Sequence, residues 1–114
     1  MPAHLRLATP EDVAAALAGR TRADLKLLTK HYMAVLNERA PGHSVEVRVP
    51  PFAAVQVIPG VRHTRGTPPA VVEMDAETWI ALARGDVSWS EAEAAGRVRA
   101  SGQRADLTPY LPLT

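Results

Sequence analysis

Hydrophobic positions in the first forty residues recur at helical spacing. The Thr-Pro-Glu-Asp segment at 9–12 has the composition of a helix start, and we expect that helix to stop at Gly19. A second, longer helix is predicted from about Thr21 to the residue before Pro41. Its apolar stripe follows a period close to 3.6 and consists of Leu25, Leu28, Tyr32, Val35 and Leu36.

The pattern then changes to strict alternation, which is typical of a half-buried strand. Residues 44–49 alternate between polar and apolar side chains, and the two prolines at 50–51 interrupt them. Residues 52–58 form a second strand candidate, so the two segments predict an antiparallel hairpin. Residues 59–69 carry Gly and Pro and are expected to form a loop, and residues 70–74 form a third strand.

The last third of the chain is predicted to return to helices around one more strand. Asp75 can cap a helix over residues 76–84, and Gly85 can end it. Ser90 and Glu93 have the spacing of a capping box and predict a short helix.

A fourth strand is expected over residues 97–100, and Asp106 is positioned to cap a final turn through Tyr110. This order predicts a single α+β domain over residues 1–114, with a mostly antiparallel twisted sheet covered by helices.

Composition restricts the possible functions. The chain has 114 residues, a formal net charge of +1 and no cysteine. The absence of cysteine excludes disulfides and thiolate chemistry. The near-neutral charge gives no reason to expect nucleic-acid binding. No apolar run approaches the roughly 20 residues of a membrane span, and the first residues lack a secretory signal, so we expect a cytoplasmic protein.

Candidate chemistry is sparse in the sequence. His4, His31, His43 and His63 do not form a helical metal motif, and each is interpreted as a surface or loop residue. We find no nucleophile–base pair, metal cluster or cofactor-binding loop, and we expect neither enzymatic activity nor a cofactor.

A basic cluster and a set of aromatic residues each allow two interpretations. Arg62, His63 and Arg65 either bind an anionic head group or form a solvated turn. Trp79 and Trp89 lie on either side of a predicted helix break. With the aromatic and aliphatic side chains of the C-terminal segment, they either pack as ordinary core or line a cavity for an apolar ligand.

The segment AVVEMDAETWIALARGDVSWSEAEAAGRVRASG, residues 70–102, resembles the second half of the sterol carrier protein family. The resemblance lies in a strand, an acidic cap, a helix ending at Gly85, a short helix, and a last strand in a Gly-x-Val-x-x-x-Gly pattern at 96–102. The preceding hairpin is similar to the early strands of that fold, so the order of elements agrees over about 70 residues. The bacterial, actinobacterial branch is the most similar.

The resemblance implies a sterol-carrier-like fold with four to five strands and an apolar tunnel between sheet and helices. Fatty-acyl chains or sterols occupy that tunnel in some members. The C-terminal segment, with Leu107, Tyr110 and Leu111, would then form a lid over the mouth of the tunnel. The residues expected to line the tunnel are Trp79, Leu82, Trp89, Val98, Leu107, Tyr110 and Leu111.

Two functions of different classes follow. The first is non-catalytic binding of a fatty acyl chain, lipid or sterol-like molecule. The second is a protein–protein interaction or homodimerisation module with a filled core, including an accessory role beside a thiol-dependent isomerase, because similar domains are fused to such enzymes.

Overall fold

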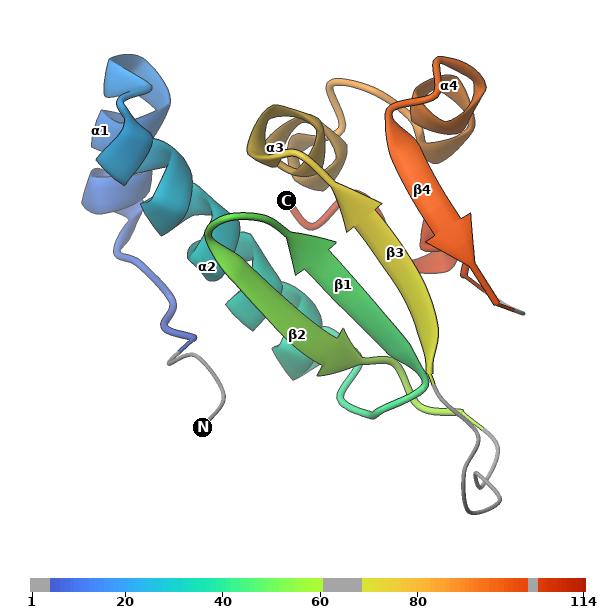
Figure 1. Cartoon of the computed structure of the whole chain (residues 1–114). Coiled ribbons are helices and arrows are strands. Elements are labelled where there is room, and N and C mark those ends of the chain that lie inside the picture. Colours follow the sequence, from blue (N-terminus) through green and yellow to red (C-terminus); the bar gives the residue numbers. More distant parts are fainter. Residues whose placement is uncertain (1–4, 61–68, 103–104) are drawn as a thin grey trace.

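The computed structural model describes residues 5–60, 69–102 and 105–114. Helices and strands alternate in blocks along the chain, as an α+β fold requires (Figure 1). The elements are α1 (Pro10–Gly19), α2 (Arg22–Arg39), β1 (Val45–Val49), β2 (Ala53–Val57), β3 (Ala70–Met74), α3 (Ala76–Arg84), α4 (Trp89–Ala94), β4 (Val98–Ser101) and the 3-10 turn η1 (Thr108–Tyr110).

The four strands form one mixed sheet in the order β2-β1-β3-β4. The hairpin β1–β2 and the pair β3–β4 are antiparallel, whereas the central pair β1–β3 is parallel. The expected mostly antiparallel sheet is therefore confirmed, with one parallel pair at its centre. That pair arises because the chain returns after β2 to the free side of β1 and starts β3 at the same end as β1.

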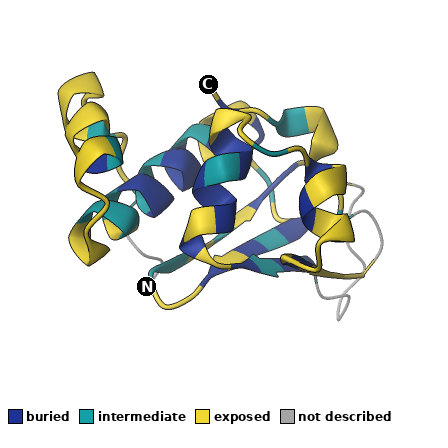
Figure 2. Ribbon diagram, turned by 90° about the horizontal axis from the view of Figure 1, so that it is seen from above, coloured by how far each residue is buried: buried dark blue, intermediate teal, exposed yellow. Residues whose placement is uncertain are grey.

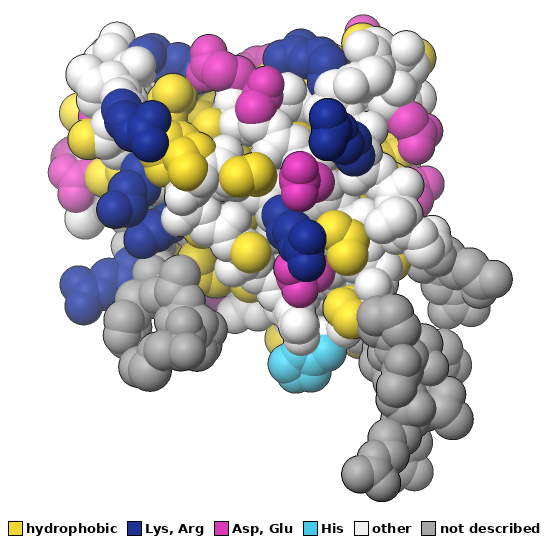
Figure 3. Space-filling model, viewed as in Figure 1, with side chains coloured by type: hydrophobic (Ala, Val, Ile, Leu, Met, Phe, Trp, Pro, Cys, Tyr) yellow, Lys and Arg dark blue, Asp and Glu magenta, His cyan; other side chains and the backbone are white. Residues whose placement is uncertain are grey.

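Alternation along the strands gives the sheet one apolar and one polar face. Val45, Val47 and Val49 of β1 are buried under the helices, and the intervening Arg48 is exposed. The opposite face carries charged side chains, including an ion pair between Arg48 and Glu46, and positive and negative groups are interspersed across it (Figure 3). Helices α2, α3 and α4 all lie on the apolar side (Figure 2).

Local caps fix the helix starts. The side chain of Thr21 accepts from the backbone N–H of Asp24, and the Asp24 carboxylate accepts from the N–H of Thr21, so α2 begins with a complete capping box. Asp75 caps α3 as expected. At the end of α3, Gly85 adopts a left-handed φ of 81°, which explains the glycine there.

The expected capping box at Ser90 and Glu93 is wrong. Ser88 and Glu91 form the box instead, and α4 begins at Trp89. Both serines have a glutamate three residues later, so spacing could not separate them. Packing distinguishes the two starts, because the earlier one places Trp89 and Ala92 in the core, at 6% and 0% exposure.

The long helix α2 buries a wider arc than its stripe predicts. Leu28, Tyr32 and Leu36 are buried as expected, whereas Leu25 and Val35 are only half-buried. The buried set also includes Thr29, Met33 and Ala34. The arc is wide because α2 contacts β2, α3 and α1.

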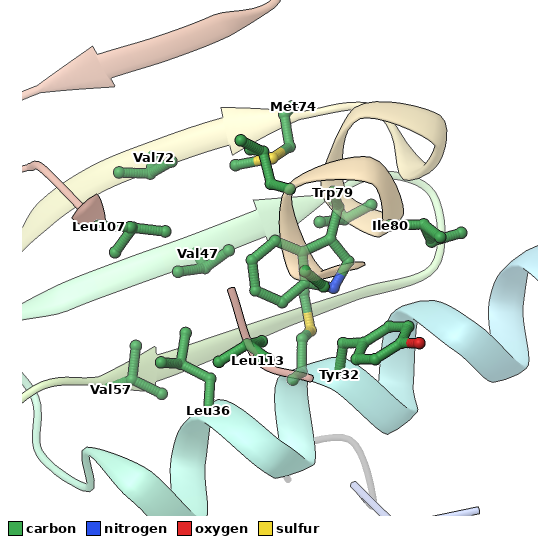
Figure 4. Close-up of a cluster of buried hydrophobic side chains, with 14 of the residues drawn as sticks. Tyr32, Leu36, Val47, Val57, Val72, Met74, Trp79, Ile80, Leu107 and Leu113 are labelled. Atoms are coloured by element: carbon green, nitrogen blue, oxygen red, sulfur yellow. The ribbon is translucent and has the colours of Figure 1, made fainter. Parts of the chain in front are cut away.

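The core lies between the sheet and the pair α2–α3 (Figure 4). Trp79 of α3 is fully buried there, and its indole N–H donates to the backbone carbonyl of Thr29 at 3.2 Å. Helix α1 packs on α2 and lies outside this layer (Figures 1 and 2).

Candidate functional site

The seven residues expected to line a tunnel are parts of the core or lie at its margin. Trp79, Leu82 and Leu107 are at most 1% exposed. Trp89 and Val98 are buried at 6% and 8%. Tyr110 and Leu111 are half-buried and pack against the same cluster. The structure brings the seven together in one hydrophobic cluster, and their role toward a ligand stays a prediction.

The C-terminal segment contributes to that core. Leu107 and Leu113 both point into the layer between sheet and helices (Figure 4) and are 0% and 3% exposed. The backbone N–H of Leu113 donates to the carbonyl of Ala83 at 2.8 Å, which joins the segment to the end of α3. Its apolar residues therefore have a packing role that does not require a ligand.

The basic cluster Arg62, His63 and Arg65 lies outside the described residues. Its interpretation as a head-group site remains a prediction from the sequence.

A groove of about 320 Å³ lies between α1, α2, the end of α3 and the C-terminal segment. Its wall is mostly apolar, and it opens to solvent because Pro10, Ala14 and Arg84 on its margin are exposed. The lining residues are Ala8, Pro10, Val13, Ala14, Leu17, His31, Tyr32, Arg84, Leu113 and Thr114. None of the seven predicted tunnel residues is among them.

Helix α1 supplies one wall of the groove. Val13 and Leu17 are four residues apart, so they lie on one face of the helix, with Ala14 beside them. Both are half-buried, and Ala16 is the buried residue of α1. The spacing of Val13 and Leu17 can be read from the sequence, but the same spacing is expected for a core face and for a groove wall.

His31 of α2 lines the groove and is half-buried, so it lies at the surface but only partly in solvent. Its Nδ1 accepts a hydrogen bond from the backbone N–H of Ala8 at 2.9 Å. The edge of its ring meets the ring of Tyr32, with centroids 4.9 Å apart. Burial lowers the pKa of His31 below its ordinary value of 6.5. The ring is therefore neutral at pH 7, and because Nδ1 accepts, its proton is on Nε2.

Arg84, the last residue of α3, supplies a positive charge at the margin. Its Nε lies 3.7 Å from a carboxylate oxygen of Asp86, and both side chains are well exposed. A solvated pair at this distance interacts weakly. The groove thus combines an apolar wall with one cationic side chain and one neutral imidazole.

The described residues show no sign of metal chemistry or of a membrane helix. No group of three or more His, Cys, Asp or Glu side chains within 5–60, 69–102 and 105–114 is arranged to hold a metal ion. Among the helices in those ranges, none is long and apolar enough to cross a bilayer.

The sequence model of a family described as bacterial SCP ortholog matches residues 21–113. That range contains the sheet, α2, α3, α4 and η1, whereas α1 precedes it. No curated protein matches the chain.

Proposed function

Because the chain belongs to the family of bacterial SCP orthologs, a sterol carrier protein-like family, we propose that it binds an apolar molecule without transforming it, and that the groove between α1 and α2 is the binding site. The observation that carries this proposal is the groove itself, about 320 Å³ in volume and walled by Val13, Leu17 and Leu113. Small-molecule sites range from about 300 to 1,000 Å³ and are mostly apolar, so this groove suits one chain or a small ring system.

Burial of apolar surface supplies the binding free energy. Each buried methylene contributes about 0.8 kcal/mol, so a segment of ~10 methylenes would gain roughly 8 kcal/mol. Association and ordering cost at least ~4 kcal/mol. The groove also leaves part of its ligand exposed, because Ala14 and Arg84 on its margin face solvent. The remaining ~4 kcal/mol corresponds to a dissociation constant of about 1 mM, so we expect weak binding of such a segment.

The layer between sheet and helices is the second candidate location, because the sterol carrier resemblance implies a tunnel there. We propose the predicted residues Trp79, Leu82, Trp89, Val98, Leu107, Tyr110 and Leu111 as its lining. Burial of Trp79, Leu82 and Leu107 argues for the groove instead, since a ligand in the layer would have to displace fully packed side chains.

The filled layer also supports a second function, a protein–protein interaction or homodimerisation module. Trp79, Leu36 and Leu107 leave no measurable surface exposed, as that alternative requires. It also requires an exposed apolar patch. Among the described large hydrophobic residues, Leu7 is exposed, at 48%. A single residue makes this the weaker candidate.

The test uses the uncharged dye Nile red as a probe, with an Ala→Trp pair on α1 as the matched variants. Ala14 lines the groove and Ala15 is exposed beside it without lining it. We expect wild type and Ala15→Trp to bind Nile red equally. Ala14→Trp should bind at least ~10-fold more weakly, because a large ring then occupies the groove.

Native mass spectrometry of the purified protein, followed by solvent extraction, identifies any lipid that copurifies. A lipid at one-to-one stoichiometry that Ala14→Trp loses supports the groove. Equal Nile red binding by both variants contradicts it. A dimer in light scattering that binds neither dye nor lipid would establish the interaction module instead.

A further inference from the structure

Two polar contacts join α1 and its flanking residues to the rest of the molecule, one near each end. Near its start, the backbone N–H of Ala8 donates to Nδ1 of His31 at 2.9 Å, which joins positions 23 residues apart. Beyond its last residue, Arg20 forms an ion pair with Glu77 of α3. The side chains of that pair are 39% and 56% exposed, and exposed ion pairs contribute little.

Packing on α2 also holds α1, through Ala16 and the inner sides of Val13 and Leu17. Ala16 is the buried residue of α1, and Val13 and Leu17 are half-buried because their outer sides line the groove. A helix of ten residues is also too short to be stable alone. The hydrogen bond between Ala8 and His31 fixes the segment that leads into α1, at the end of this groove wall opposite the Arg20–Glu77 pair.

We propose that His31 is the positioning residue of the groove: its neutral ring holds the segment before α1, and protonation of Nδ1 releases that segment, displaces the α1 wall and lowers ligand affinity. The part of this proposal that concerns affinity rests on the proposed function. The part that concerns the position of α1 stands on the contacts alone.

The chemistry of imidazole makes the contact depend on pH. The backbone N–H can only donate, so Nδ1 must carry a lone pair, and the imidazolium form has none on either nitrogen. Burial lowers the pKa of His31 below its ordinary value, so the ring is neutral at pH 7 and the contact is lost as pH falls through that lowered pKa.

Charged groups on the surrounding elements are of both signs. Glu11 and Asp12 lie in the first turn of α1, Lys30 precedes His31 on α2, and Arg84 lines the same groove from α3. Histidine is the side chain whose ordinary charge change falls between about pH 5 and 8. A variant at His31 alone therefore separates its titration from all other groups.

The experiment compares wild type with His31→Asn and His31→Phe by ¹⁵N NMR and Nile red binding from pH 7.5 to 5. Asn offers a side-chain oxygen that accepts from the Ala8 N–H and does not titrate, whereas Phe keeps a ring but accepts nothing. In wild type, the Ala8 amide and the α1 amides should shift with the His31 ring titration. Nile red affinity should fall about five- to tenfold over the same range, as expected for the loss of one hydrogen bond.

The two variants should separate the effect of the hydrogen bond to Ala8 from the effect of the charge on His31. His31→Asn should keep neutral-pH binding at both pH values, and His31→Phe should show the weak binding of acidic wild type throughout. Ala8 and α1 amides that do not respond when His31 titrates would overturn the proposal, as would a His31→Asn variant that retains the wild-type pH profile. Nile red affinity that is constant while α1 moves would overturn its link to binding.

Failure of the proposed function gives a different pattern. In that case wild type binds no Nile red at pH 7.5, while the NMR transition and its removal by His31→Asn persist and still support the positioning role.

Discussion

Helix α2 borders two apolar spaces, and side chains fill them to different degrees. On one side, α3 buries six of its nine residues against α2 and the sheet. On the other side, α1 buries one of its ten residues. The first space is a packed core around Trp79, and the second is an open groove of about 320 Å³.

The difference comes from residue size and from the number of elements that converge. The α3 face presents Trp79, Ile80 and Leu82, and the C-terminal segment adds Leu107 and Leu113 from outside the helices (Figure 4). The sequence of α1, PEDVAAALAG, has four alanines and two larger aliphatic residues. Small side chains cannot close the distance to α2, so a space remains.

The range matched by the family model includes the packed core but not helix α1. The packed layer lies within residues 21–113, whereas the α1 wall of the groove precedes that range. The α1 wall of the groove therefore lies outside the matched range, whereas its α2, α3 and Leu113 walls lie within it.

Truncation of the central core residue should have the largest effect on stability. Trp79→Ala should lower the free energy of unfolding by about 3–5 kcal/mol, because it leaves a cavity and removes the indole hydrogen bond to the carbonyl of Thr29. Leu17→Ala, on the groove side, should cost about 1 kcal/mol, since its side chain is only half-buried. Urea denaturation measures both, and equal losses would contradict the contrast between the two spaces.

Truncations within the C-terminal segment test whether it belongs to the packed layer. Leu107→Ala should cost about 2–4 kcal/mol, because Leu107 is fully buried. Leu111→Ala should cost about 1 kcal/mol, because Leu111 is half-buried. Thermal and urea unfolding of the matched pair provide the measurement. A Leu107→Ala protein as stable as wild type would show that the segment is a removable cover instead.

The smallest effect is expected for Tyr110→Ala in ligand binding. Tyr110 does not line the groove, so Nile red affinity should stay within about twofold of wild type. Fluorescence titration measures it, with Ala14→Trp as the variant that should lose binding. A large loss in Tyr110→Ala with binding retained in Ala14→Trp would locate the ligand in the layer between sheet and helices, under a lid formed by the C-terminal segment.

Local rules predicted most elements well. The third strand over 70–74, the α3 cap at Asp75 and the stop at Gly85 all depend on contacts within a few residues, and the structure confirms them. The start of α4 was wrong because two Ser–Glu pairs satisfied the same local rule. The choice between them depends on burial of Trp89, which involves residues distant in sequence.

Periodicity, caps and glycine positions thus determined by themselves the α+β class and the order of elements. These are short-range properties, because a helix cap or a strand alternation acts over a few residues. Only the tertiary structure decided which apolar space is filled. That outcome depends on whether Leu107 and Leu113 reach the layer beside Trp79, and on the contact of His31 with Ala8 across 23 residues. The hydrophobic effect drives apolar side chains inward without direction, and chain geometry determines where they meet.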